Sequence, residues 1–159
     1  MTQAAVAPVL VFGWGNLSRG DDALGPLCIA RLREIFAASD SIEFLEDYQL
    51  QVEHALDLAN RQRVLFVDAS LTSPAPFEVT TMEAAQDASY TTHAMSPQAL
   101  MHVYAQLQGE PAPACTLLAI RGERYELGEA PTAQALDHLQ AAVQWAQQWL
   151  TEPAGAATH

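Results

Sequence analysis

Short apolar segments alternate along the chain with longer segments in which apolar residues recur every three or four positions. The short segments are typical of buried strands, and the longer ones are typical of helices with one buried face. Strands are predicted at residues 9–12, 41–46, 64–67, 77–82 and 115–120, and helices at residues 24–35, 52–59, 97–108 and 132–150. We therefore expect an α/β fold: a three-layer sandwich with a mainly parallel twisted sheet of about five strands flanked by helices.

Two parts of this pattern predict how the elements are buried. Residues 64–67 are consecutive apolar residues, so this strand is predicted to lie at the centre of the sheet. The last helix has one apolar stripe, formed by Leu136, Leu139, Val143, Ala146 and Leu150. Trp145 and Trp149 lie beside this stripe. We expect them to extend the buried face, and a patch that docks a protein partner is the alternative.

The first predicted strand leads into a glycine-rich turn and then into the first helix. Gly13 and Gly15 let the chain turn tightly, and Pro26 fits only the first turn of a helix. The two glycines are also typical of a dinucleotide-binding turn, but Asp21 and Asp22 stand where a pyrophosphate would meet the helix N-terminus. These carboxylates would repel phosphate. They are either helix caps or, beside a flexible turn, part of a cation site.

Aspartates are predicted at the carboxyl ends of three different strands, where ligands bind in open α/β sheets. They are Asp22, Asp47 and Asp68. Asp68 follows a run of apolar residues, where packing gives no reason for a carboxylate, although it could cap the next loop. If the first and third strands are neighbours, Asp22 and Asp68 face one cleft. A solvated strand end explains Asp47 equally well.

A histidine could complete a metal site with two of these carboxylates. His93 lies in a polar loop just ahead of the helix that begins at Ser96 and Pro97. With Asp22 and Asp68 it would form an open site of two carboxylates and one imidazole, which leaves positions for substrate. A lone histidine in a loop is usually only a solvated side chain, which is the alternative. The other histidines are His54 and His102, expected within helices, His138, expected to be exposed on the last helix, and His159 in the tail.

Composition narrows the class of protein. With 159 residues, half of them hydrophobic, the chain is expected to form a single domain over residues 1–159 with an ordered core at about residues 8–151. The formal net charge of −12 argues against nucleic acid or an anionic membrane as a partner. No apolar run reaches the roughly 20 residues that span a bilayer, and the N-terminus lacks a signal-peptide pattern. Cys28 and Cys115 form no metal or disulfide motif, so we expect buried thiols and a cytoplasmic protein.

Three segments resemble the motifs of one enzyme family. Residues 13–25 read GWGNLSRGDDALG, residues 67–69 read VDA at the end of an apolar strand, and His93 stands ahead of the Ser-Pro pair at 96–97. Together, over about residues 9–150, they resemble the nickel–iron hydrogenase maturation proteases. Those endopeptidases remove a C-terminal extension from the hydrogenase large subunit after nickel has been inserted.

The resemblance implies a substrate and a site. The partner would be a hydrogenase large-subunit precursor, and nickel would be supplied by that precursor rather than permanently bound. The nickel ligands and catalytic residues would be Asp22, Asp68 and His93. Asp47 and a nickel-bound water are both candidates for the base. The residues expected to contact the substrate are Gly15, Asn16, Asp47 and Gln49, and we expect a monomer.

Several alternatives stay open. No Ser-His-Asp or Cys-His arrangement stands out, so a peptidase with this sequence would activate water through a metal or a carboxylate. Residues 47–54, DYQLQVEH, resemble the branch of the family that serves cytoplasmic NAD-reducing hydrogenases. His102 is a second candidate for the histidine ligand. The other functions considered are a non-enzymatic nickel-dependent assembly factor and a nucleotide-binding α/β domain.

Overall fold

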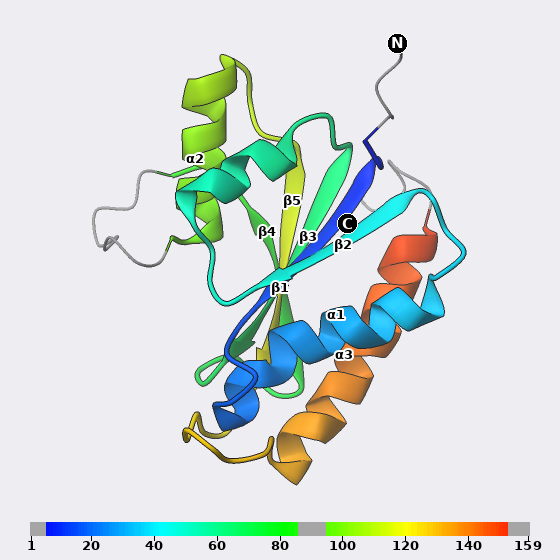
Figure 1. The fold of residues 1–159 in the computed structure, drawn as a ribbon, viewed down its shortest axis with the longest axis vertical. Helices are drawn as coiled ribbons and strands as arrows, with labels where there is room; N and C mark the ends of the chain where they lie inside the picture. Colours follow the sequence, from blue (N-terminus) through cyan, green and yellow to red (C-terminus); the bar gives the residue numbers. More distant parts are fainter. Residues whose placement is uncertain (1–5, 86–94, 153–159) are drawn as a thin grey trace.

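A five-stranded sheet forms the middle layer of the protein (Figure 1). The computed structural model describes residues 6–85 and 95–152. The strands are β1 (Val9–Trp14), β2 (Ile42–Asp47), β3 (Arg63–Ser70), β4 (Phe77–Met82) and β5 (Ala114–Arg121), in the order β2-β1-β3-β5-β4. Only β4 runs antiparallel to its neighbour, so the predicted α/β class and mainly parallel sheet are confirmed.

Helices cover both faces of the sheet. They are η1 (Gly20–Ala23), α1 (Leu24–Ile35), η2 (Val52–Leu58), α2 (Pro97–Gln108) and α3 (Ala133–Thr151). Figure 1 shows α1 and α3 side by side on one face, which we call the α1 face, and α2 with η2 on the other, the α2 face. η1 and η2 are 3₁₀ helices, whereas the sequence pattern predicted an ordinary helix at residues 52–59. Among the described helices, none is long and apolar enough to cross a membrane.

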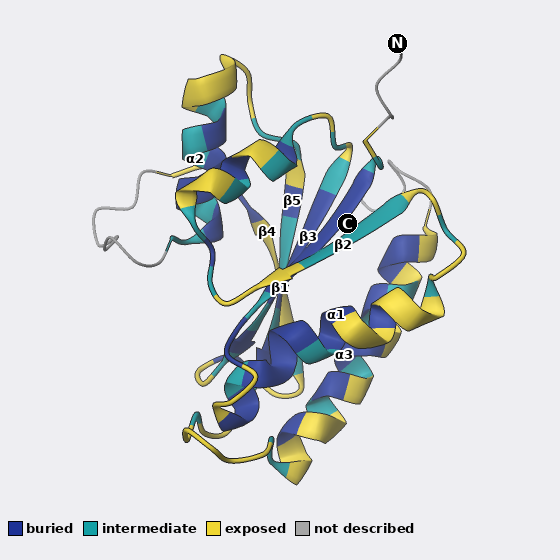
Figure 2. Ribbon diagram, in the orientation of Figure 1, coloured by how far each residue is buried: buried dark blue, intermediate teal, exposed yellow. Residues whose placement is uncertain are grey.

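Each face of the sheet has its own apolar core. Alternate residues of β1 and β3 point to opposite faces. Leu65 and Val67 pack in the core of the α1 face, and Val64 and Phe66 pack in the core of the α2 face. Figure 2 shows β1 and β3 buried along much of their length, which explains why their sequences are continuous apolar runs.

The helix ends follow the sequence signals. Ser96 caps α2, since its hydroxyl accepts a hydrogen bond from the Ala99 N–H at 3.0 Å, and Pro97 is the first helical residue. Gly109 ends α2 with a φ of 69°, a conformation that glycine adopts readily. The Thr132 hydroxyl caps α3 in the same way.

The structure confirms the predicted burial of the two cysteines and differs from the sequence predictions at Leu136 and His138. Cys28 and Cys115 are buried free thiols, as expected, and they lie in the cores of opposite faces. Leu136 was predicted in the buried stripe of α3, but 37% of it is exposed. The buried side of α3 is centred on Ala135, Leu139, Ala142, Val143, Ala146, Trp149 and Leu150. His138, expected to be exposed, is half-buried with Nδ1 2.9 Å from the Arg121 carbonyl oxygen.

Candidate active site

The glycine turn after β1 brings the start of α1 unusually close to the ends of the strands. Gly15 has a φ of 151°, and a Cβ there would collide with the carbonyl oxygen of Asp22. Gly25, in the first turn of α1, packs directly against the backbone of Trp14, where a Cβ would also collide. The close approach places Asp22 beside the carboxyl end of β1, as the sequence predicted.

Asp22 uses one carboxylate oxygen to hold the turn. Its Oδ2 accepts a hydrogen bond from the Asn16 N–H at 2.9 Å, and the residue is half-buried. In a dinucleotide-binding turn, backbone N–H groups of this kind bind phosphate. Here a carboxylate already occupies the Asn16 N–H, which argues against the nucleotide-binding alternative.

Asp68 lies on the strand next to β1, on the α2 face and at the carboxyl edge of the sheet. The adjacency is direct, because Gly13 of β1 pairs with Val67 of β3. Burial raises the pKa of the Asp68 carboxyl, and the charge of Asp22 adds to this. Hydrogen bonds from the Ala69 N–H, 2.8 Å from Oδ1, and from Trp14 act in the opposite direction, which leaves the pKa at about 7. The charges of Asp22 and Asp68 therefore lie close enough to affect each other.

The proposed histidine ligand lies outside the described residues. His93 falls in the range 86–94, so its position relative to the two aspartates stays a prediction. His102 is half-buried on α2. Within residues 6–85 and 95–152, no three His, Cys, Asp or Glu side chains are grouped so that they could hold a metal ion. Of the three predicted ligands, the structure describes Asp22 and Asp68, and the ligand set stays a prediction.

The sequence left two interpretations of Asp21, a helix cap or a residue of a cation site. In the structure, Asp21 holds a loop that is distant in the sequence. Its fully buried carboxylate accepts hydrogen bonds from the N–H groups of Glu123 at 2.6 Å and Thr132 at 2.6 Å. The Thr132 hydroxyl donates at 2.9 Å and the Arg124 N–H at 3.3 Å. Burial on its own would raise the pKa of Asp21, but these four hydrogen bonds outweigh it and lower the pKa. Asp21 is a structural residue that fixes the loop between β5 and α3 to η1.

This loop carries a residue that the sequence did not single out. Tyr125 is half-buried and packs against the core of the α1 face. Burial raises the pKa of its hydroxyl, and the nearby charges of Asp68, Asp22 and Asp21 raise it further. Tyr125 is therefore a neutral hydroxyl near the two candidate ligands. An aromatic residue within the polar stretch 121–131 was the only signal for it in the sequence.

A hollow of about 290 Å³ lies at the carboxyl ends of β1 and β2. Three of the four residues predicted to contact substrate line it: Gly15, Asn16 and Asp47. The fourth, Gln49, is half-buried and is not part of the lining. The remaining lining residues are Leu17, Ser18, Pro26, Glu46 and Tyr48. The hollow is open on one side and mixes polar and apolar walls, as a site for an extended peptide would.

Comparison with known proteins adds to this geometry. No family model and no curated protein matches the chain. Solved structures do match. The [NiFe] hydrogenase maturation protease HycI from Thermococcus kodakarensis matches 92% of this chain and 94% of its own, with 19% identity and a TM-score of 0.71.

Two further structures agree with the first. The hydrogenase maturating endopeptidase HybD from E. coli matches 89% of this chain and 91% of its own, with 22% identity and a TM-score of 0.67. A hydrogenase 2 maturation peptidase from a Thaumarchaeota archaeon matches 90% of this chain and 97% of its own, with 21% identity and a TM-score of 0.65. The chain has the fold of the hydrogenase maturation proteases.

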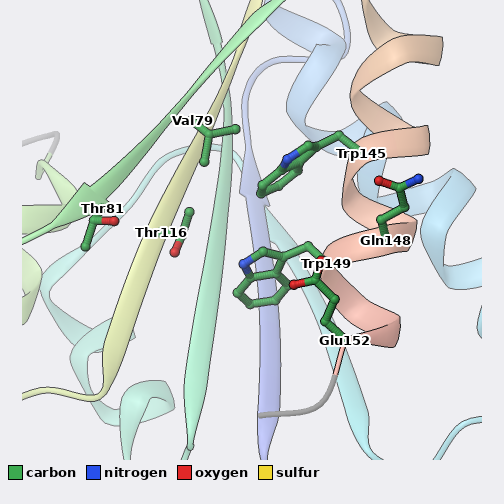
Figure 3. A pocket seen from close by; sticks show the side chains of 7 residues that line it. All are labelled: Val79, Thr81, Thr116, Trp145, Gln148, Trp149 and Glu152. Atoms are coloured by element: carbon green, nitrogen blue, oxygen red, sulfur yellow. The ribbon is translucent and has the colours of Figure 1, made fainter. Parts of the chain in front are cut away.

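A second hollow, of about 230 Å³, lies on the α1 face near the amino end of β5 (Figure 3). Trp145 and Trp149 project from α3 toward strand residues of β4 and β5, among them Val79 and Thr116. Trp149 is buried and Trp145 packs against the same core, which confirms that the two tryptophans extend the buried face of α3. The Arg63 guanidinium lies 4.0 Å from the centre of the Trp149 ring. Because the parallel strands end at the opposite edge of the sheet, this hollow is separate from the candidate active site.

Proposed function

We propose that this chain is an endopeptidase that removes the C-terminal extension of a nickel–iron hydrogenase large-subunit precursor after nickel insertion. The observation that carries the proposal is the position of Asp22 and Asp68. Asp22, in η1, lies beside the carboxyl end of β1, and Asp68 lies on the adjacent strand β3, in a chain with the fold of the maturation proteases. Structures with this fold described as maturation proteases or peptidases match about nine-tenths of this chain.

Nickel, in this proposal, arrives as part of the substrate and serves as a recognition element. The two carboxylates suit a divalent cation, because each accepts fewer hydrogen bonds than its two oxygens can take. Asp22 accepts one from the Asn16 N–H, and Asp68 accepts bonds from the Ala69 N–H and the Trp14 side chain. A nearby cation would also favour the ionised form of Asp68, whose pKa of about 7 otherwise keeps much of it protonated at neutral pH. We propose His93 as the third ligand.

The residues of the chain would then position the peptide. The hollow beside Asp22 is lined by Gly15, Asn16 and Asp47 and would hold the segment next to the scissile bond. Tyr125 offers a neutral hydroxyl near the acidic pair. Asp47 remains a candidate base for the attacking water.

We propose in addition that the protein acts in the cytoplasm as a monomer and binds metal only through its substrate. The two free thiols in separate cores are consistent with a reducing compartment.

The proposal is tested by incubating the protein with nickel-loaded and nickel-free precursor and measuring the mass of the precursor. The expected result is loss of the C-terminal extension from the nickel-loaded form alone. Binding of the loaded precursor with no change in its mass would identify a non-enzymatic assembly factor instead. No binding and no cleavage would contradict both functions.

A further inference from the structure

A continuous chain of hydrogen bonds runs from Asp22 along the rim of the hollow. The Asn16 N–H donates to Asp22, and the Asn16 side-chain amide donates to the Tyr48 hydroxyl at 2.6 Å. The Tyr48 N–H donates to Asp47 Oδ1 at 2.6 Å. Asp47 Oδ2 lies 3.0 Å from His54 Nε2. His54 therefore belongs to the same hydrogen-bonded assembly as the candidate ligand Asp22, although it lies in η2.

The surroundings of His54 fix the position of its proton. The Gln51 N–H donates to His54 Nδ1 at 2.9 Å, so Nδ1 is an acceptor and carries no hydrogen in the neutral ring. The proton is then on Nε2, which donates it to Asp47. Only 12% of the His54 side chain is exposed, and the Phe12 ring packs edge-on against the imidazole at 4.6 Å between ring centres. The imidazole is held in one orientation and one tautomer.

Asp47 differs from His54 in facing solvent. Its side chain is 41% exposed and lines the hollow. Each carboxylate oxygen accepts one hydrogen bond from the protein, one from Tyr48 N–H and one from His54. An ionised carboxylate can accept about four hydrogen bonds, so each oxygen keeps capacity for a further donor. The arrangement presents a fixed acceptor to any N–H group of a peptide that enters the hollow.

We propose that His54 is the positioning residue that orients Asp47 for binding the peptide substrate. His54 itself does not contact substrate; it holds the carboxylate through Nε2 and is in turn held by the Gln51 N–H. The proposal rests on the proposed endopeptidase function. It concerns Asp47 as a substrate-binding residue, and an effect on kcat rather than on KM would indicate a role in proton transfer instead.

Two substitutions separate this role from a purely structural one. In His54→Asn, the side-chain oxygen can take the place of Nδ1 and keep the Gln51 N–H satisfied, but the donor to Asp47 is lost. In His54→Gln, the side-chain amide can reach the position of Nε2 and keep the bond to Asp47, but the acceptor for Gln51 is lost. Glu53→Gln, on the exposed side of η2, is the matched control for a change in this helix.

The variants are compared by the KM and kcat with which they cleave the nickel-loaded precursor. His54→Asn should raise KM about tenfold and leave kcat within about twofold, because the lost hydrogen bond is to a charged group that binds substrate. His54→Gln and Glu53→Gln should keep KM within about twofold of the wild-type value. Equal KM values for the two His54 variants, or a fall in kcat with unchanged KM, would overturn the proposal.

A spectroscopic measurement keeps this result distinct from failure of the proposed function. Nitrogen-15 NMR of the free protein should show His54 with a protonated Nε2 and an unprotonated Nδ1, and Asp47→Asn should shift the Nε2 proton. The opposite tautomer would overturn the positioning role whether or not the protein cleaves the precursor. Wild-type protein that leaves loaded precursor intact while showing the expected tautomer would contradict the endopeptidase function instead.

Discussion

Two neighbouring regions at the start of α1 use aspartate in opposite ways. In the first, the carboxylate of Asp21 receives four hydrogen bonds from the loop between β5 and α3, and its pKa is lowered. In the second, Asp68 on β3 receives fewer hydrogen bonds, and burial raises its pKa to about 7. Burial alone therefore does not decide the direction of a pKa shift in this protein, because burial disfavours the ionised form of both aspartates. The hydrogen bonds that each carboxylate accepts decide it.

The comparison predicts the largest loss of stability for Asp21→Ala. The substitution leaves three N–H groups and one hydroxyl in the loop junction without their acceptor, at a cost of about 3 kcal/mol or more in the free energy of unfolding. Thermal unfolding should show a decrease in Tm of about 10 °C. Asp21→Asn keeps one acceptor oxygen, so its Tm should lie between those of the wild-type protein and Asp21→Ala. A Tm within about 2 °C of the wild-type value would show that the loop does not depend on Asp21.

Asp68→Asn should have the opposite effect on stability. Because the pKa of Asp68 is raised from 3.8 to about 7 on folding, the folded protein binds this proton more tightly than the unfolded chain. The stability that the protonated carboxyl contributes is full below about pH 3.8 and is lost as the pH rises through about 7. Asn is permanently neutral, so at pH 8 the variant should be more stable by about 2–4 kcal/mol, with little difference at pH 4.

Denaturant unfolding at the two pH values measures this difference. Asp137→Asn, on the exposed side of α3, removes one charge at a site without this burial and is the control. If Asp68→Asn were destabilising at pH 8, the contrast between Asp21 and Asp68 would be wrong. We expect the same variant to process precursor more than about a hundredfold more slowly, because it loses a proposed nickel ligand.

A smaller effect is expected on the pKa of Asp68 when Asp22 is replaced. The charge of Asp22 contributes to the raised pKa of Asp68, so Asp22→Asn should lower that pKa. Carbon-13 NMR titration of the Asp68 carboxyl measures the change directly. An unchanged titration would mean that the two side chains do not share one site.

The smallest effect is expected away from both regions, at the second hollow. Trp145→Phe removes part of a half-buried ring that packs on Trp149, so we expect a loss of about 1 kcal/mol in the free energy of unfolding. Precursor processing should be unchanged, because the hollow lies at the opposite edge of the sheet. Slower processing with normal stability would instead favour a docking role for the two tryptophans.

The sequence was sufficient for those features that depend on neighbouring residues. The strand and helix order, the cap at Ser96 and the position of Asp68 at the end of an apolar run all follow from local pattern. Leu136 was misplaced because the small residues of α3, such as Ala135, let that side of the helix pack closely, which hydrophobic periodicity does not detect.

The features that the sequence did not reveal depend on contacts between distant segments. The partners of Asp21 lie more than a hundred residues further along the chain. Tyr125 lies near the acidic residues because hydrogen bonds from the turn between β1 and α1, among them those of Asp21 and Arg19, hold its loop. Neither of these features has a local pattern that could have predicted it.

The central claim is that Asp22 and Asp68 engage nickel carried by the precursor rather than a metal of their own. It is tested most directly by treating the purified protein with a chelator, removing the chelator, and measuring cleavage of nickel-loaded precursor by mass spectrometry. The account predicts an undiminished rate, and no cleavage of nickel-free precursor by the same preparation. Activity that is lost on chelation and restored by zinc alone would contradict the claim and identify an ordinary metallopeptidase.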